Sequence, residues 1–145
     1  IAQEFVKFDE DLRYSRNTTN SEIKGQIELK ILSQDIKITA IADRIEVDKQ
    51  GYATILDYKT GTLPTKKEVL SGLSPQLILE AIILLNGGFN IRINKIQKLV
   101  YVKIASSEPY IQTVEIDLSA SELDKHLKGL IELLEYYVDC KAFPN

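Results

Sequence analysis

The stretch that decides the fold covers residues 38–61 and reads ITAIADRIEVDKQGYATILDYKTG. Two segments in which apolar and polar residues alternate flank the turn-forming run DKQG, and this pattern predicts a β-hairpin. Asp43 belongs to the first predicted strand, and Asp57 and Lys59 belong to the second. Side chains alternate between the faces of a strand, so Asp57 and Lys59 should point the same way. The short turn should bring Asp43 nearly level with Asp57.

Charged side chains on the inner face of a sheet are costly unless they are paired or bound to a metal. A divalent cation would explain the two carboxylates, and a water beside that cation would explain Lys59. The plain alternative is that Asp43 forms a surface ion pair with Arg44 or Lys59. In that alternative Lys59 is a strand lysine that reaches solvent.

The order of these residues resembles a known family. Asp43 is followed, after thirteen residues, by Asp-Tyr-Lys, within the words ADRI and LDYKTG. This pattern resembles the PD-(D/E)XK nuclease superfamily, and most of all its RecB-type branch. The next stretch, GTLPTKKEVLSGLSPQLILEA, is similar to the C-terminal nuclease domain of AddB-type double-strand-break repair proteins. The resemblance, which covers roughly residues 22–85, implies an α/β restriction-endonuclease-like core, a mixed central sheet with helices on both faces.

The resemblance also implies roles for individual residues. Asp43, Asp57 and the backbone carbonyl of Tyr58 would hold Mg²⁺, for which Mn²⁺ would substitute. Lys59 would orient or deprotonate the attacking water, or stabilise charge on the scissile phosphate. Gln76 would hold that water or a phosphate oxygen. Otherwise Gln76 marks a helix edge that faces solvent.

Four further residues are weaker candidates. Glu22, in SEIKG, resembles an acidic residue at the start of the family's first strand and would complete the metal site. Glu80 stands where the family often has a tyrosine, and it would support the metal ligands or pair with the catalytic lysine. Lys66 and Lys67 follow the site and would grip the DNA backbone. Each also has a plain interpretation: a strand end in water, a helix edge in solvent, and two solvated loop lysines.

The composition is that of one globular domain. The chain has 145 residues, of which 44% are hydrophobic. Its net charge is −3, so the overall charge does not indicate a nucleic-acid-binding protein. Its one cysteine, Cys140, cannot form a disulfide within the chain, nor the four-cysteine iron–sulfur cluster of some RecB-type relatives. His126 is the only histidine, and we expect it on a helix surface. The most apolar run, residues 77–85, is too short to span a bilayer, and we expect a cytoplasmic protein with no membrane partner.

The remaining elements follow from periodicity and from helix-start and turn signals. We predict helices over residues 1–13, 74–85 and from 119 onward, the second opened by Ser74-Pro75 and the third by a capping box, Ser119 with Glu122. Strands are predicted over residues 22–32, 36–43, 52–59, 95–104 and 111–118, the first three as an antiparallel meander. Residues 16–20, 33–35 and 61–74 are predicted as loops or turns.

The sequence therefore predicts a magnesium-dependent deoxyribonuclease, an exonuclease of RecB or AddB type that processes double-strand breaks during recombination. Residues 1–145 would form a single domain cut from a longer helicase–nuclease subunit with an AddA-like partner. One alternative is a catalytically retired nuclease-like domain that binds DNA or scaffolds such a complex. Another is an interaction domain without a nucleic-acid role, in which Asp43 and Asp57 do not converge.

Overall fold

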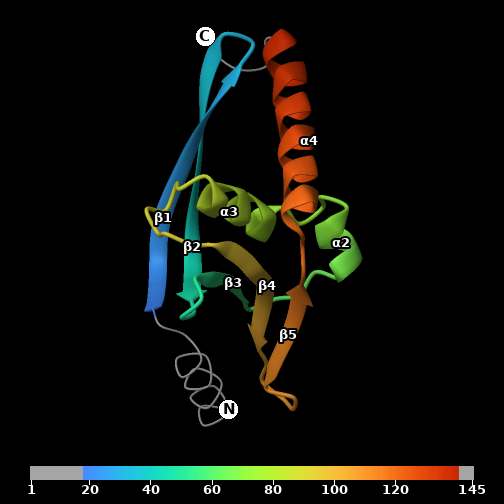
Figure 1. Ribbon diagram of the computed structural model, residues 1–145. Helices are drawn as coiled ribbons and strands as arrows, with labels where there is room; N and C mark the ends of the chain where they lie inside the picture. The colour runs from blue at the N-terminus through green and yellow to red at the C-terminus, as the bar shows by residue number, and fades with distance from the viewer. Residues whose placement is uncertain (1–17, 141–145) are drawn as a thin grey trace.

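The computed structural model describes residues 18–140, which form a five-stranded mixed sheet flanked by helices (Figure 1). The strand order is β1-β2-β3-β4-β5, in which β3 and β4 run parallel and the other neighbours run antiparallel. The predicted restriction-endonuclease-like α/β fold is confirmed. In chain order the elements are β1 (Thr18–Ile31), β2 (Gln34–Val47), β3 (Tyr52–Lys59), α2 (Lys66–Leu70), α3 (Gln76–Leu85), β4 (Lys95–Ile104), β5 (Ile111–Ile116) and α4 (Ala120–Asp139).

The predicted antiparallel meander of β1, β2 and β3 is confirmed. The β1–β2 turn is tighter than predicted, because only Leu32 and Ser33 lie outside the strands, both with positive φ, as a type I′ turn requires. At the β2–β3 turn the Asp48 carboxylate accepts hydrogen bonds from the backbone N–H groups of Gln50 and Tyr52, at 2.9 and 3.0 Å. These local bonds hold the hairpin that carries the candidate site.

The loop predicted over residues 16–20 is wrong from Thr18 onward, where β1 begins. Ladder pairing with β2 extends to Thr18 opposite Val47, and the Thr19 hydroxyl donates a 2.8 Å hydrogen bond to Glu46. Pairing with β2, which is distant in sequence, thus makes this polar segment a strand. The helix predicted over residues 1–13 lies outside the described residues.

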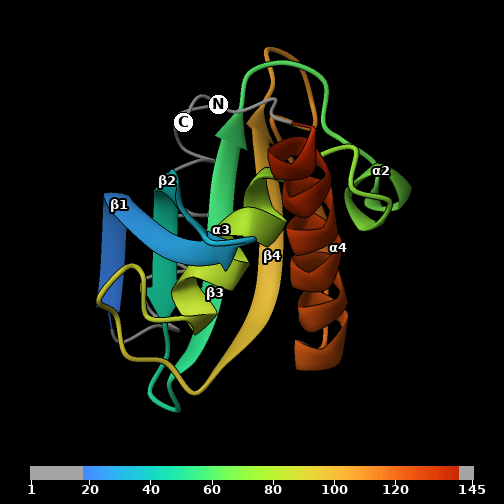
Figure 2. The same ribbon diagram turned by 90° about the horizontal axis from the view of Figure 1, so that it is seen from above.

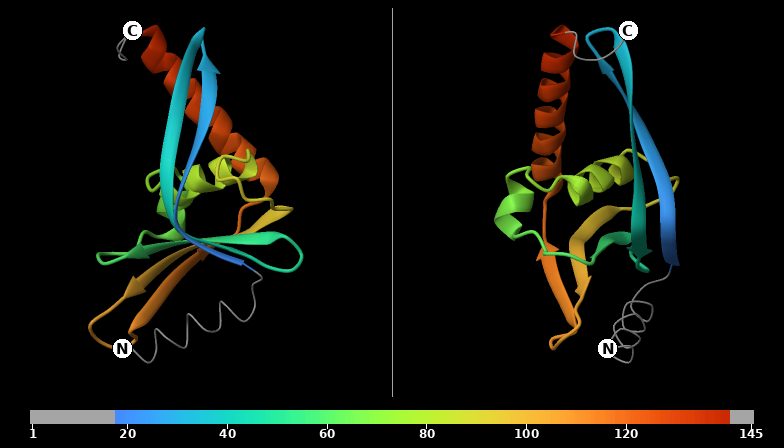
Figure 3. Two further views of the ribbon diagram at one scale, coloured as in Figure 1. Left: turned by 90° about the vertical axis from the view of Figure 1, so that its left-hand side faces the viewer. Right: turned by 180° about the vertical axis from the view of Figure 1, so that it is seen from behind.

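A bend divides the β1–β2 hairpin in two. Glu22 has a φ of +47°, and it lies opposite Asp43, between the pairs Ser21–Arg44 and Ile23–Ala42. On β2, both Ala42 and Ile45 join the main core, so the alternation of faces shifts by one residue at this point. Figure 3 shows the outer half of the hairpin leaving the sheet and rising beside α4. The shift places Asp43 in phase with Ile45, on the face that α3 covers.

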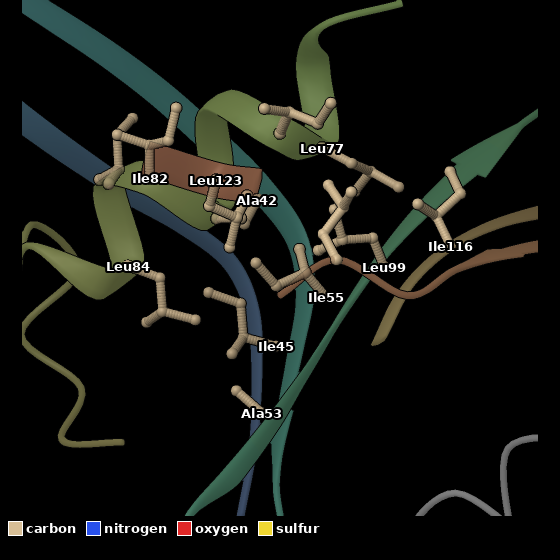
Figure 4. Packing of buried hydrophobic residues seen from close by; sticks show 14 of the residues in the cluster. Ala42, Ile45, Ala53, Ile55, Leu77, Ile82, Leu84, Leu99, Ile116 and Leu123 are labelled. Atoms are coloured by element: carbon tan, nitrogen blue, oxygen red, sulfur yellow. The ribbon is translucent and has the colours of Figure 1, made fainter. Parts of the chain in front are cut away.

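The main core lies between the sheet and the described helices. Helix α3 crosses the sheet (Figure 2) and buries most of its side chains, as its apolar sequence predicts. Figure 4 shows Leu77 and Leu84 of α3 packed toward strand residues such as Ile45 and Ile55. The opposite face of the sheet carries a smaller cluster, which comprises Leu56, Val100 and Val102. All described helices contribute to the first core, so a helix on the second face, which we predicted, is not among residues 18–140.

Helix boundaries give two corrections. The predicted loop over residues 61–74 contains helix α2, which a capping box between Thr65 and Glu68 opens and the buried Val69 anchors. Helix α3 starts one residue later than predicted, because the carbonyl of Pro75, not Ser74, accepts its first hydrogen bond. Strand β5 also ends two residues early, at Ile116.

The long helix α4 starts as predicted, with the reciprocal Ser119–Glu122 capping box. Leu123 of this helix reaches the main core, and the partly buried Leu127 packs against it. Between residues 18 and 140, no helix is long and apolar enough to pass through a membrane.

Two glycines fix the far end of α3 against β1. The backbone N–H of Gln26 donates to the carbonyl of Gly88 at 3.1 Å. A Cβ on Gly88 would lie 2.3 Å from the Gln26 carbonyl oxygen, and a Cβ on Gly25 would lie 2.4 Å from the ring of Phe89. At Gly88 the clash is with the backbone, so a side chain there would force the strand and the end of the helix apart, whereas at Gly25 the ring of Phe89 would have to move.

Candidate active site

Asp57, Lys59 and Gln76 form one connected polar group beneath the start of α3. The amide nitrogen of Gln76 donates to Oδ1 of Asp57 at 2.8 Å, and Lys59 Nζ donates to Oε1 of Gln76 at 3.0 Å. Lys59 Nζ also lies 3.1 Å from Oδ2 of Asp57. Asp57 and Lys59 thus share a face of β3, as alternation predicts, and Gln76 faces them. Gln76 is itself exposed to solvent, but its side-chain amide bonds both of these residues.

Asp43 joins this group from the neighbouring strand. Its Oδ2 accepts a 2.8 Å hydrogen bond from the backbone N–H of Tyr58, and its carboxyl group is within hydrogen-bonding reach of Asp57. The ladder pairs Arg44 with Leu56, so the next step along both strands sets Asp43 level with Asp57. The predicted convergence of the two aspartates is confirmed. It removes the alternative in which they point to opposite faces.

The environment of Asp57 disfavours its charged form. Burial, and after it the hydrogen bond with Asp43, raise the pKa of Asp57 to about 6, although Lys59 acts to lower it. Only 2% of Asp57 is exposed. A divalent cation bound beside this carboxyl would favour its charged form and displace the proton.

Glu80 lies one turn along α3 on the same side and is fully buried. Burial raises its pKa to about 8, with the charges of Asp57 and Asp43 adding to the effect and the Gln76 amide opposing it. Neither carboxylate oxygen of Glu80 has a partner in hydrogen-bond geometry among residues 18–140. Glu80 therefore belongs to the site and not to a solvent-facing helix edge.

The donor set suits a hard divalent cation. Oδ2 of Asp57 is buried and accepts no hydrogen bond in good geometry, although Lys59 lies beside it. Asp43 and the backbone of Tyr58 are adjacent. Within the described ranges, no three Asp, Glu, His or Cys side chains are arranged as a ready metal cluster. Mg²⁺ commonly needs only one or two carboxylates, because waters and substrate phosphates complete its shell, so the residues present fit this ion.

Of the four weaker candidates, Glu22, Lys66 and Lys67 are not brought into contact with this group. Glu22 lies across the ladder from Asp43, but its side chain is exposed and no bond joins it to the other carboxylates of the described chain. Lys66 and Lys67 are exposed on α2. Roles for these three residues in metal or DNA binding stay predictions, as do the chemical roles assigned to Asp43, Asp57, Tyr58, Lys59, Gln76 and Glu80.

Sequence reasoning missed Tyr101. It lies on β4 in register with Asp57, is 1% exposed, and has its ring centroid 5.6 Å from Lys59 Nζ. Burial raises the pKa of Tyr101, and its hydroxyl donates a long, 3.5 Å hydrogen bond to the carbonyl of Ser74. The ring face thus supports the ammonium group of Lys59. No local signal reveals this contact, because it depends on parallel pairing between strands that are distant in sequence.

Known proteins resemble this chain over its whole length. A family model for the PD-(D/E)XK nuclease superfamily matches residues 1–145. The chain is 50% identical to a protein of Rickettsia bellii (strain RML369-C), and 44% identical to one of Rickettsia felis (strain ATCC VR-1525 / URRWXCal2) and to RT0391 of Rickettsia typhi (strain ATCC VR-144 / Wilmington). All three carry the name "Uncharacterized protein", and each match covers 99% of this chain. The chain spans only 19% to 21% of the length of these relatives.

A solved structure, that of the protein SSO0001, has the same fold. It superposes with a TM-score of 0.50, covers 88% of this chain and 56% of its own, and is 19% identical in sequence.

Proposed function

The chain belongs to the PD-(D/E)XK nuclease superfamily, and on that premise we propose that it is a magnesium-dependent DNA-cleaving domain of RecB or AddB type. The observation that carries the proposal is the convergence of Asp43 and Asp57 with Lys59 and Gln76 in one bonded group. The order of these residues along the chain is that of the family motif.

Each residue has a task in phosphodiester hydrolysis. Asp43 and Asp57, with the carbonyl of Tyr58, would hold the divalent cation. When bound, that cation supplies a Lewis acid that neutralises charge on the phosphate. Lys59 sets a positive charge where the phosphate oxygens become more negative as water attacks in line. Gln76 accepts from Lys59 and donates to Asp57, and so it keeps both groups aimed at one point.

The wider setting is part of the proposal. The relatives are about five times as long as this domain, which suits a nuclease domain within a larger helicase–nuclease subunit. An AddA-like partner subunit would deliver broken DNA ends to it, in the cytoplasm, during recombinational repair. The net charge of −3 gives the domain little electrostatic grip on DNA of its own, so delivery by a motor explains how an acidic nuclease finds its substrate.

The test compares Asp57→Ala with the parent in the full-length protein. We expect the variant to lose Mg²⁺-dependent cleavage of single-stranded DNA and to lose Mn²⁺ binding by calorimetry, while its circular dichroism spectrum is retained. Binding of Mn²⁺ by the parent without any cleavage would instead support a retired nuclease. Absence of both metal binding and cleavage in the parent would exclude the nuclease function.

A further inference from the structure

A groove of about 380 Å³ opens beside the candidate catalytic residues, and Lys59 and Gln76 form part of its lining. Three larger hollows, of about 520, 460 and 410 Å³, contain none of the candidate catalytic or metal-binding residues. Sites for small molecules measure about 300–1,000 Å³, so the groove has room for one nucleoside and little more. If the proposed function holds, what occupies this groove is the part of the substrate next to the scissile phosphate.

The walls of the groove suit a flat, weakly polar group. Leu63 and Pro64 line it from the segment after β3, and Pro75 lines it from the start of α3. Tyr101 contributes to the lining, but with 1% of the residue exposed its ring cannot serve as a stacking platform. A nucleobase would therefore pack against aliphatic and proline surfaces, which bury it without reading its identity.

The charges in the lining are of opposite sign and are kept apart. Lys59 brings an ammonium group, and Glu68 brings a carboxylate from α2. No ion pair joins these two side chains among the described residues, since Lys59 pairs with Asp57 and Oε1 of Glu68 accepts from Thr65 in the capping box. A phosphate is attracted by the first and repelled by the second. The groove is thus matched to an occupant that is anionic on one side and neutral on the other.

We propose that this groove receives the terminal nucleoside of a DNA strand, with its phosphodiester toward Lys59 and its hydroxyl end toward Glu68. A strand that continued past the nucleoside would place a second phosphate near the Glu68 carboxylate. The proposal rests on the proposed nuclease function and specifies its substrate as a strand end. Glu68 then selects against a terminal phosphate, and it does so without touching the reacting atoms.

The experiment uses the full-length protein and single-stranded oligothymidylates that end in a hydroxyl or a phosphate at the degraded end, with both polarities tried. At low salt we expect the hydroxyl end to be cut about fivefold faster, because an exposed charge pair is worth about 1 kcal/mol. Glu68→Gln should abolish most of this preference and keep the helix cap, since glutamine also serves in a capping box. Glu122→Gln, the same change in the capping box of α4, should leave the preference intact.

A second pair of variants tests the apolar wall. Leu63→Ala should raise KM for the hydroxyl-ended oligonucleotide about fivefold with kcat unchanged, because it removes buried contact with the base. Leu73→Ala, the same truncation at a side chain that is 77% exposed and outside the groove, should leave KM unchanged. Equal rates on both ends in the parent, or a preference that survives Glu68→Gln, would overturn the proposal.

Two further measurements separate this proposal from the function on which it rests. Bis(p-nitrophenyl) phosphate has a phosphodiester but no nucleoside, so its hydrolysis reports the catalytic group alone. If it is hydrolysed while the preference for a hydroxyl end is absent, the groove proposal fails and the nuclease function stands. If nothing is cleaved, the nuclease function fails, and methyl NMR of Leu63 and Leu73 with thymidine 5′-monophosphate still decides occupancy. A shift at Leu63 alone supports the groove, and no shift at Leu63 overturns it.

Discussion

Two polar clusters lie back to back on β2 and β3, one on each face of the sheet. The site cluster, on the α3 face, comprises Asp43, Asp57, Lys59, Gln76 and Glu80. The opposite cluster comprises Thr19, Arg44, Glu46 and Tyr58. Their members alternate along the same strands. The chain therefore builds two different polar interiors from neighbouring residues.

The two clusters differ in how their charges balance. In the opposite cluster the Arg44 guanidinium pairs with Glu46, which also accepts from Thr19, and Arg44 reaches the Tyr58 hydroxyl at 3.2 Å. The site cluster gathers carboxyl groups from Asp43, Asp57 and Glu80 around the single ammonium group of Lys59. Balanced buried charge serves the fold, whereas an excess of one sign costs stability and is expected where a counter-ion or substrate binds.

The largest expected effect tests the one cation of the site cluster. Lys59→Ala should lower the rate of Mg²⁺-dependent DNA cleavage by about 10²–10⁴-fold, the contribution typical of a positioned catalytic group. Mn²⁺ binding, measured by calorimetry, should be retained because Lys59 supplies no metal ligand. Lys103→Ala is the control, since Lys103 lies beside Lys59 in the β3–β4 ladder and has no bond to Asp57. A Lys59→Ala protein that cuts at the parent rate would show that the site cluster works differently.

The next effect concerns the balanced cluster. Glu46→Gln should lower the free energy of unfolding by about 3–5 kcal/mol, because it removes the buried carboxylate that pairs with the Arg44 guanidinium. Urea denaturation measures the loss. Glu115→Gln, which breaks the exposed pair with Lys98, should cost less than about 1 kcal/mol. Equal losses for the two pairs would mean that the opposite cluster does not hold the fold together.

In the site cluster, replacing the buried carboxyl group of Glu80 should have a smaller effect on the free energy of unfolding, and one of opposite sign. The pKa of Glu80 is about 8 in the folded chain and 4.5 when unperturbed, so between these values the folded state binds more protons than the unfolded state. Metal-free stability should therefore fall as the pH rises from about 4.5 to about 8. Glu80→Gln removes the Glu80 contribution to this dependence, so it should raise the free energy of unfolding at pH 8 and change it little at pH 4.5. Thermal unfolding of parent and variant in EDTA at both pH values measures this change. A Glu80→Gln protein that is less stable than the parent at pH 8 would contradict the prediction.

The smallest expected effect concerns DNA binding, and it tests whether α2 belongs to the DNA-binding surface. Replacing Lys66 and Lys67 together by Ala should flatten the salt dependence of single-strand binding by about 1–2 units of log K per log salt, as expected for two lost phosphate contacts. Lys24 and Lys37, exposed on the β1–β2 hairpin, form the control pair. Fluorescence anisotropy across a salt series measures both slopes. Equal slopes for the two double variants would remove α2 from the DNA-binding surface.

Much of the site follows from local sequence. Strand alternation and one short turn suffice to place Asp57, Lys59 and Asp43 together, because each step depends only on residues near in sequence. The helix signal at Ser74-Pro75 is correct to one residue and brings Gln76 to them. Short-range physics thus predicts the contacts that the family motif requires.

Other features depend on contacts that no local pattern carries. The bend at Glu22 shifts the phase of β2, and only the ladder reveals it. Tyr101 meets Lys59 through the parallel β3–β4 pairing. Helix α2 was not predicted for a different reason. The Thr65-x-x-Glu68 capping box is present in the sequence, but so short a helix has too few apolar residues to show a period.

The glycine contact beyond the end of α3 makes the position of the whole helix depend on β1. Gly88, three residues past the end of α3, is held against Gln26 on β1, and Gln76 lies at the opposite end of the helix, a rigid rod about 15 Å long at the usual rise per residue. A side chain at Gly88 would push the rod outward and swing the Gln76 amide away from Asp57. In a saturation library selected for cleavage, Gly88 should therefore be as intolerant as the residues proposed to act at the phosphate. Such a position would be mistaken for a binding residue by anyone who ranked positions by sensitivity alone.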